Sequence, residues 1–312
     1  MKINVLGLKK HFKKTKAVDG ISFNFGSGDI FGFVGPNGAG KTTTMRIMAT
    51  IDDATDGDIY FDDISAREYP EKIRKFVGFV PDLLPNHNDI TVHEYLDFFA
   101  RAYGLKGKER RSALGGVKEF TGLGPLQDKL LNDLSKGMKQ RVSLGRALIH
   151  NPPVLVMDEP ASGLDPHARI ELRELLKILV EQKKAILISS HILSELTEIC
   201  NGVVIIEKGK ILETGTIEEV VTRGTPRRII FLRPLEGLDN VHKELLQMPF
   251  MHSVTLVGKE LRIEIDGTEE ACSQILTDII KRGYKIAEFR HQHSDLEDIF
   301  LKVTKGGVSE PS

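Results

Sequence analysis

Short runs of apolar and β-branched residues alternate with amphipathic stretches along the first 221 residues of the chain. The apolar runs predict strands at residues 21–25, 30–34, 77–80, 154–157, 185–189 and 203–207. The amphipathic stretches predict helices at 92–103, 108–120, 134–149 and 165–181. Because alternation of this kind is typical of α/β domains, we expect one such domain over residues 1–221.

A basic turn at residues 220–228, which contains Gly224 and Pro226, interrupts this pattern and predicts a linker at 222–227. Beyond it the pattern predicts strands at 228–232, 253–257, 261–265 and 284–289 and helices at 241–247 and 269–281. The order βαββαβ predicts a small α+β, ferredoxin-like accessory domain over residues 228–305. A last helix is expected at 295–303, and the small polar residues 306–312 predict a flexible tail.

Length and charge support two domains and exclude a global attraction to nucleic acid. The chain has 312 residues, with 43 Lys and Arg against 44 Asp and Glu, so phosphate binding has to be local. The two cysteines, Cys200 and Cys272, lie far apart without metal-ligand spacing, which fits a reducing cytoplasm. No apolar run approaches the roughly 20 residues that span a bilayer, so a membrane role would require another chain.

Residues 35–43 read GPNGAGKTT between a predicted strand and a helix, which is the context of a phosphate-binding loop. The three glycines allow positive φ and a close approach of backbone N–H groups to phosphate. Lys41 is expected to reach the β- and γ-phosphates, Thr42 to ligate Mg²⁺ and Thr43 to contact the α-phosphate. The predicted loop contacts with ATP are Gly35, Pro36, Asn37, Gly38, Ala39, Gly40, Lys41, Thr42 and Thr43.

A second motif, VLVMDEP, ends a predicted buried strand in Asp158 and Glu159. Adjacent strand residues point to opposite sides, so the two acids can have different roles. We expect Asp158 to hold Mg²⁺ through water and Glu159 to polarise the water that attacks the γ-phosphate. The alternative is that acids here only cap helices, as the Asp165–Pro166 pair is suited to do.

A third motif, LSKGMKQR at 134–141, begins a helix with a serine cap and Gly137, which leaves N–H groups at a positive helix end. Together with SGLD and the SSH at 189–191, these motifs resemble the Walker A, signature, Walker B, D-loop and H-loop of ABC ATPases. The resemblance implies a P-loop NTPase cassette. It would have a RecA-like core, an antiparallel β subdomain and a helical subdomain at about 83–150.

The resemblance also implies a head-to-tail dimer, formed with a second copy or a similar subunit, that uses ATP and Mg²⁺. In such a dimer Ser135, Lys136 and Gly137 would cap the partner's ATP, and Asp165 would signal across the interface. His191 would contact the γ-phosphate and hold the attacking water with Glu159. By the same resemblance Phe12 would stack on adenine and Val18 would pack beside it.

Two positions depart from the family pattern. The signature LSGGQ is here LSKGM, so Lys136 adds a cation and Met138 replaces an amide. The glutamine of the Q-loop is replaced by Asp82, which can approach Mg²⁺ through water but is shorter and negatively charged. The alternative for Asp82 is an ordinary Pro–Asp turn without direct metal contact.

The overall layout and the C-terminal DLEDIFLKVT resemble ATPase subunits of ABC-2-type exporters. That resemblance implies a peripheral subunit at the cytoplasmic face of the membrane, whose separate permease would dock at residues 82–89 and choose the cargo. The alternative is a soluble ABC ATPase acting on DNA or ribosomes. Neither fused cassettes nor basic stripes favour it, so no nucleic-acid partner is expected. A degenerate cassette without turnover is disfavoured by the presence of Lys41, Asp158, Glu159 and His191.

Overall fold

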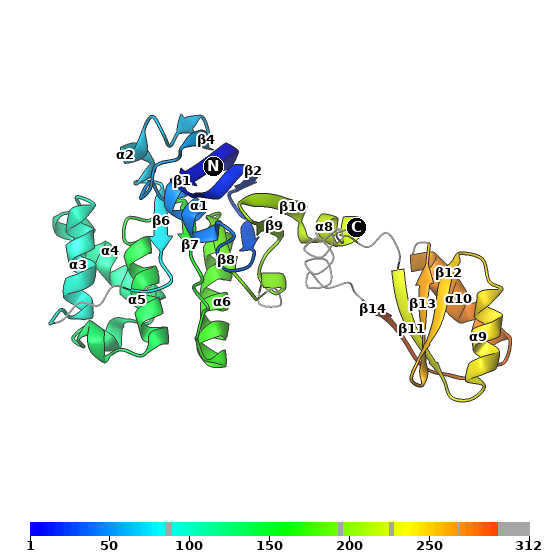
Figure 1. Cartoon of the computed structure of the whole chain (residues 1–312). Helices are drawn as coiled ribbons and strands as arrows, with labels where there is room; N and C mark the ends of the chain where they lie inside the picture. Colours follow the sequence, from blue (N-terminus) through cyan, green and yellow to red (C-terminus); the bar gives the residue numbers. More distant parts are fainter. Residues whose placement is uncertain (85–88, 193–195, 225–227, 267–268, 293–312) are drawn as a thin grey trace. The chain divides into compact units, whose positions relative to one another are not determined.

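The computed structural model describes residues 1–84, 89–192, 196–224, 228–266 and 269–292 (Figure 1). The chain forms two compact units, one from Met1 to Ile217 and one that begins at Glu218. The helix expected at 295–303 and the tail expected at 306–312 lie outside the described residues.

The first unit is built on a six-stranded sheet in the order β10-β9-β3-β8-β7-β6. Its strands are β3 (Ile30–Val34), β6 (Val77–Val80), β7 (Val154–Met157), β8 (Ala185–Ser190), β9 (Gly202–Glu207) and β10 (Lys210–Thr216). All neighbours pair in parallel except β10, which is antiparallel to β9. The strands expected at 30–34, 77–80 and 154–157 are confirmed at both ends, and those at 185–189 and 203–207 are each one residue longer.

A second, antiparallel sheet in the order β2-β1-β4-β5 belongs to the same unit. It consists of β1 (Lys2–Phe12), β2 (Thr15–Gly26), β4 (Asp56–Phe61) and β5 (Ile64–Ser65). Its inner face shares one core with helix α1 (Lys41–Met48) and the main sheet. In this core the rings of Phe23 and Phe33 stack with their centroids 5.5 Å apart. Burying a phenylalanine contributes about 2–3 kcal/mol, so this core fixes the β1–β2 hairpin relative to α1.

Three helices, α3 (Val92–Ala102), α4 (Gly107–Phe120) and α5 (Lys136–Leu148), pack together beside β6 (Figure 1). A capping box of Thr91 and Glu94 begins α3. Arg146 of α5 donates a hydrogen bond of 2.6 Å to the carbonyl oxygen of Phe79. The expected helical subdomain therefore contacts the core at the strand that leads to Asp82. The remaining helices of this unit include α2 (Pro70–Ile73) and α6 (Pro166–Glu181).

From residue 228 onward, the described residues of the second unit have the element order βαββαβ. The elements are β11 (Arg228–Pro234), α9 (Leu238–Leu246), β12 (Met251–Val257), β13 (Glu260–Ile265), α10 (Glu269–Lys281) and β14 (Ile286–Gln292). The sheet order β12-β13-β11-β14 is fully antiparallel, with β13 inserted between β11 and β12. This arrangement confirms the expected small α+β domain with its own core.

The expected linker at 222–227 differs from the structure, because helix α8 (Ile217–Gly224) covers its first three residues. The helix begins with two acidic residues, Glu218 and Glu219, which favour its positive end. The last three residues of the expected linker, 225–227, lie outside the described residues.

Candidate functional site

One hollow of the first unit collects most of the residues that the sequence pointed to. It measures about 530 Å³, within the range of roughly 300–1,000 Å³ typical of small-molecule sites. Its lining comprises Phe12, Thr15, Ala17, Asn37, Gly38, Ala39, Gly40, Lys41, Thr42, Thr43, Asp82, Asp158 and Glu159. Residues from four distant parts of the sequence therefore surround one space.

The backbone conformation and close packing of the loop before α1 require glycine at several positions. Gly38 and Gly40 have φ of 80° and 108°, a region that disfavours side chains. A Cβ on Gly35 would lie 2.2 Å from the carbonyl oxygen of Ile206, and one on Gly40 would lie 2.4 Å from that of Ala17. The loop is thus held closely against β9 and β2, and it leads into the N-terminus of α1, which favours anions.

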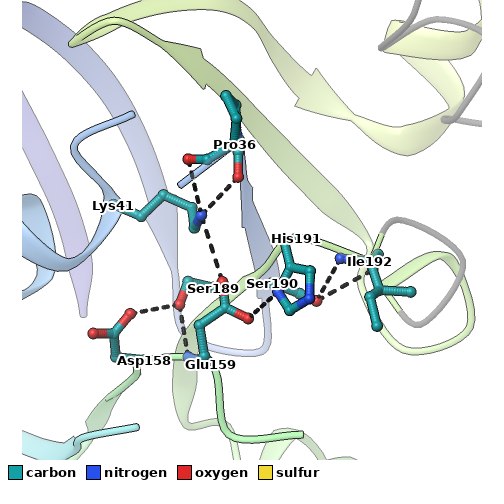
Figure 2. Close-up of polar contacts among 9 residues, drawn as sticks. Pro36, Lys41, Asp158, Glu159, Ser189, Ser190, His191 and Ile192 are labelled. Atoms are coloured by element: carbon teal, nitrogen blue, oxygen red, sulfur yellow. Dashed lines mark hydrogen bonds and ion pairs between the residues drawn. The ribbon is translucent and has the colours of Figure 1, made fainter. Parts of the chain in front are cut away.

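Lys41, the first residue of α1, is buried and has three oxygen neighbours (Figure 2). Its ammonium donates to the carbonyl oxygens of Gly35 at 2.6 Å and Pro36 at 3.3 Å. Its Nζ also lies 3.4 Å from Oε1 of Glu159. The lysine therefore links the glycine loop directly to the acidic motif after β7.

Asp158 and Glu159 are held together by a serine at the end of the neighbouring strand β8 (Figure 2). The Ser189 hydroxyl donates to Oδ1 of Asp158 at 2.8 Å, and it accepts a hydrogen bond of 2.8 Å from the backbone N–H of Glu159. Asp158 and Ser189 are both buried. Because β7 and β8 are parallel neighbours, their ends meet at the same edge of the sheet.

His191 completes this chain of contacts. Its Nδ1 lies 2.8 Å from Oε2 of Glu159, so the two carboxylate oxygens face a histidine and a lysine (Figure 2). Glu159 has φ of 45°, in the left-handed region, which is uncommon for a residue with a side chain. Such backbone strain costs about 1–3 kcal/mol and is concentrated at functional sites. The position of this carboxylate between Lys41 and His191 is thus accompanied by an unfavourable backbone conformation at Glu159.

Asp82, which follows β6, brings a third carboxylate to the same hollow. Partial desolvation raises its pKa, and Asp158 and Glu159 raise it further, whereas Lys136 and His191 lower it. Three carboxylates and the hydroxyl of Thr42 form a set of hard oxygen donors, the kind that Mg²⁺ prefers. Among the described residues no three acidic, histidine or cysteine side chains are grouped closely enough to hold a metal by themselves. The donors present therefore fit a cation held largely by water and phosphate, which would offset the repulsion between the carboxylates.

The two residues expected at adenine behave differently. Phe12 has 54% of its surface exposed and lines the hollow, with the ammonium of Lys10 over its ring at 5.4 Å from the centroid. Val18 is fully buried in the shared core and is not among the lining residues, so it supports the hairpin from behind. Ala17 and Thr15 occupy the position next to Phe12 that the sequence reasoning gave to Val18.

The residues expected to serve a partner lie outside the lining of this hollow. Ser135 is the N-cap of α5, and its hydroxyl accepts from the N–H of Met138 at 3.3 Å. Asp165 is the N-cap of α6 and accepts from the N–H of Ala168 at 3.0 Å, a bond that lowers the pKa of its carboxyl group. Ser135 and Lys136 are exposed at the start of α5 and are available to another molecule.

Ser189 is the functional residue that the sequence reasoning missed. It was part of the quoted SSH motif, but it received no role of its own. A serine within a fully buried strand, directly after a run of apolar residues, is a signal that could have identified it, because a buried hydroxyl needs a partner.

Comparisons with known proteins identify the family of this chain. A family model described as "ABC transporter" matches residues 18–162. The chain is 32% identical to the Nod factor export ATP-binding protein I of Burkholderia thailandensis over 95% of both chains. It is 30% identical to the linearmycin resistance ATP-binding protein LnrL of Bacillus subtilis, covering 95% of this chain and 96% of that one.

Solved structures give the same result for the fold. An ATP-binding subunit of an ABC transporter superposes with a TM-score of 0.65 at 27% identity, covering 72% of this chain and 93% of that one. A dimeric ATP-binding cassette in a post-hydrolysis state, bound to ADP and phosphate, superposes with a TM-score of 0.63 at 25% identity. It covers 69% of this chain and 98% of its own.

Proposed function

This chain belongs to the ATP-binding proteins of the ABC transporter family and hydrolyses ATP, and we propose that it powers a separate membrane-crossing permease of the ABC-2 exporter type. The observation that carries the proposal is the hydrogen-bonded chain Asp158–Ser189–Glu159–His191 next to Lys41. Each member has a role in binding or hydrolysing the nucleotide.

The hollow accommodates ATP with its phosphates at the loop before α1. Adenine stacks on Phe12, and the backbone N–H groups of residues 38–43 surround the phosphates. The ammonium of Lys41 exchanges its contact with Glu159 for the β- and γ-phosphates, because a polyphosphate offers more negative charge than one carboxylate. Nucleotide binding thereby frees the carboxylate of Glu159.

Mg²⁺ supplies neutralisation of phosphate charge when it is bound. Thr42 would hold it directly, and Asp158 and Asp82 would hold it through water. Ser189 keeps Asp158 oriented by donating a hydrogen bond to Oδ1.

Hydrolysis requires a water molecule in line with the γ-phosphate and a group that accepts its proton. We assign Glu159 as that base and His191 as the group that contacts the γ-phosphate and orients the glutamate. Ser189 fixes the backbone of Glu159 through its N–H, which makes the serine a positioning residue.

The composite site needs a second cassette. Ser135, Lys136 and Gly137 at the N-terminus of α5 are suited to cap ATP on a partner, and Asp165 lies at the N-terminus of α6 where it can reach across. A related cassette forms dimers in its post-hydrolysis state, which supports a head-to-tail pair here.

The relatives favour export over the soluble alternative. These relatives are named for Nod factor export and linearmycin resistance, and both align over nearly the whole chain. Among the described residues, no helix is long and apolar enough to cross a membrane. The permease is therefore proposed as a separate chain that docks on the cytoplasmic face near residues 82–89, of which 85–88 lie outside the described residues.

The Glu159→Gln variant tests the assignment of base and dimer together. With MgATP it should lose hydrolysis while keeping ATP binding, and it should elute as a dimer in size-exclusion chromatography. Glu119→Gln, an exposed change on α4, serves as the matched control and should behave as wild type. Unchanged hydrolysis in Glu159→Gln would refute the base, and a monomer saturated with ATP would refute the head-to-tail pair.

Co-purification tests the transport role. The full-length chain, expressed in its own cells with an affinity tag, should bring down a polytopic membrane protein from detergent extracts. Recovery of ribosomes or DNA in its place would overturn the proposal.

A further inference from the structure

Strand β12 (Met251–Val257) lies at one edge of the four-stranded sheet of the second unit. Among the described strands its one neighbour is β13, so the outer side of β12 has no strand partner there. Such an edge is a template for another strand, and proteins usually protect it with charged side chains or proline. The sequence of β12, MHSVTLV, contains no Asp, Glu, Lys, Arg or Pro.

The opposite edge of the same sheet, strand β14, is protected by charge. Glu288 of this strand lies 3.5 Å from Nε of Arg233 on β11. Arg290 of the same strand lies 2.8 Å from Glu260 on β13. The two edges therefore differ in the kind of partner that they can accept, and β12 is the one open to an uncharged strand.

The turn between β12 and β13 decides which backbone groups of β12 remain for a partner. Val257 and Glu260 pair across a two-residue turn, residues 258–259. In a hairpin of this length the closing pair is hydrogen-bonded, and bonded and non-bonded pairs then alternate along the strands. The N–H and C=O groups of Val254 and Leu256 therefore point away from β13.

A contact with the neighbouring helix agrees with this alternation. The carbonyl oxygen of Val254 lies 3.1 Å from Nε2 of His242 on α9, outside the ladder between β12 and β13. A carbonyl oxygen has two lone pairs, so the contact with His242 leaves Val254 able to accept a second hydrogen bond.

The side chains at this edge are also only partly covered. Leu256 has 54% of its surface exposed, although its cross-strand partner Leu261 is fully buried. Directly opposite residues share a face of the sheet, so Leu256 lies on the core side. The core of the second unit is thus open at β12, and a further strand would cover it.

We propose that β12 pairs with β12 of a second copy of this chain, antiparallel and about a two-fold axis at Thr255, so that the two sheets become one. In this register Val254 of each copy lies opposite Leu256 of the other. These two residues then exchange backbone hydrogen bonds in both directions, because their N–H and C=O groups are the outward ones. Thr255 faces Thr255 in a non-bonded pair.

A second copy fits this edge because the strand is complementary to itself. Leu256 is covered by an apolar Val254, and no like charges meet across the axis. The irregular register between Met251 and Ser253 lies at the end of the paired residues and does not interrupt them. A two-fold contact of this kind closes on itself and leaves no further edge to grow from.

The pairing rests on the proposed function, because the head-to-tail cassettes bring the two copies together. Interfaces that hold stable complexes bury about 1,200–2,000 Å², and one short strand covers much less. The strand pair is therefore weak in free solution. Once ATP has joined the cassettes, the second contact forms within one complex, where a weak contact is effective.

Cysteine cross-linking of the full-length chain tests the register. Thr255→Cys places two thiols across the axis, where the Cα atoms of a non-bonded pair lie about 4.5 Å apart, within the range of about 4.4–6.8 Å for disulfides. Ala287→Cys, at an exposed position of the other edge strand, is the matched control. The native Cys200 and Cys272 are both buried.

Each cysteine variant is oxidised in the Glu159→Gln background with MgATP, and also without nucleotide at high protein concentration in the otherwise unaltered chain. Thr255→Cys should form a disulfide-linked homodimer at least about tenfold faster than Ala287→Cys in both settings. Thermal melting under reducing conditions checks that each variant keeps its fold.

A charge substitution tests the energetics of the same contact. Thr255→Lys in the Glu159→Gln background places two ammonium groups opposite each other, and like charges in this position are unfavourable. The dimerisation constant with MgATP, measured by sedimentation equilibrium at low salt, should weaken by about threefold to tenfold. Thr277→Lys, the same change at an exposed position of α10, should leave it within about twofold.

Equal cross-linking rates of Thr255→Cys and Ala287→Cys would overturn the pairing, and so would equal effects of the two lysine substitutions. A disulfide from Thr255→Cys to a different protein in intact cells would show that another partner occupies the edge. If Glu159→Gln forms the ATP-bound dimer and Thr255→Cys does not cross-link, only the strand pairing is wrong. If Glu159→Gln stays monomeric, the head-to-tail pair is wrong, and the nucleotide-free cross-linking still decides the strand pairing.

Discussion

Ser189→Ala is the substitution that most directly tests how the site is held together. The change removes a hydroxyl that donates to Oδ1 of Asp158 and accepts from the N–H of Glu159, both at 2.8 Å. It changes neither the charge nor any residue that we place on the nucleotide. Any loss of activity therefore measures positioning.

The expected cost follows from what the hydroxyl leaves behind. Asp158 is 4% exposed and Ser189 is fully buried, so water replaces neither lost bond well. An unpaired buried donor or acceptor costs about 1–3 kcal/mol. Part of this cost appears in the free energy of unfolding and part in catalysis. Since about 1.4 kcal/mol corresponds to a factor of ten in rate, we expect kcat to fall about tenfold to a hundredfold.

Phosphate release under saturating MgATP gives kcat, and titration with ATP gives KM. KM should change by less than about threefold, because the contacts of Ser189 are with the hydrolytic residues and not with the phosphate loop. Ser143→Ala is the matched control: that serine is also fully buried, but its hydroxyl has no hydrogen-bond partner among the described residues. A kcat for Ser189→Ala within twofold of the Ser143→Ala value would refute the positioning role.

Two further predictions concern the rim of the site and the base of the helical subdomain. Phe12→Ala should weaken ATP binding, measured by calorimetry, by about 1–3 kcal/mol, because the stacking on adenine is lost. Phe98→Ala removes an exposed ring outside the hollow and should leave ATP binding unchanged. Equal effects of the two substitutions would contradict the assignment of Phe12 to adenine. Burial lowers the pKa of His150 from 6.5 to about 4, and its neutral ring stacks on Tyr103 at 3.8 Å. The unfolded chain therefore takes up this proton first, and stability present above pH 6.5 is lost as the pH falls toward 4. When the pH falls from about 7.5 to about 5, the free energy of unfolding of His150→Phe should decrease by about 2 kcal/mol less than that of the wild type, as measured by urea unfolding. The same pH dependence in both proteins would contradict a buried neutral histidine at this position.

The parallel strands could be predicted because strands buried on both faces consist of short, continuous runs of apolar residues. Val77–Val80 and Val154–Met157 are covered on both faces and therefore read as short, continuous apolar runs. Strand β1 was not predicted, since its alternation is broken by register shifts between Val5 and Leu8. An irregular strand of this kind has no fixed period to detect.

The part of the site that could be predicted is the part formed by consecutive residues of one motif. The residues of the phosphate loop are neighbours in the chain, so their type and spacing were enough. Val18 shows where this fails: side chains on a strand alternate, and a difference of one residue turns Val18 to the core and leaves Ala17 at the hollow. The contact of Ser189 with Asp158, and the effect of Lys136 on Asp82, depend on elements that only the fold brings together.

The left-handed backbone at Glu159 has an evolutionary consequence. Glycine would relieve the strain of about 1–2 kcal/mol at this position, and a single nucleotide change converts either glutamate codon into a glycine codon. Selection for stability alone would therefore favour glycine and a cassette that does not hydrolyse ATP, and only selection for turnover retains the glutamate. In a lineage that no longer needed hydrolysis, we expect this position to be among the first to drift.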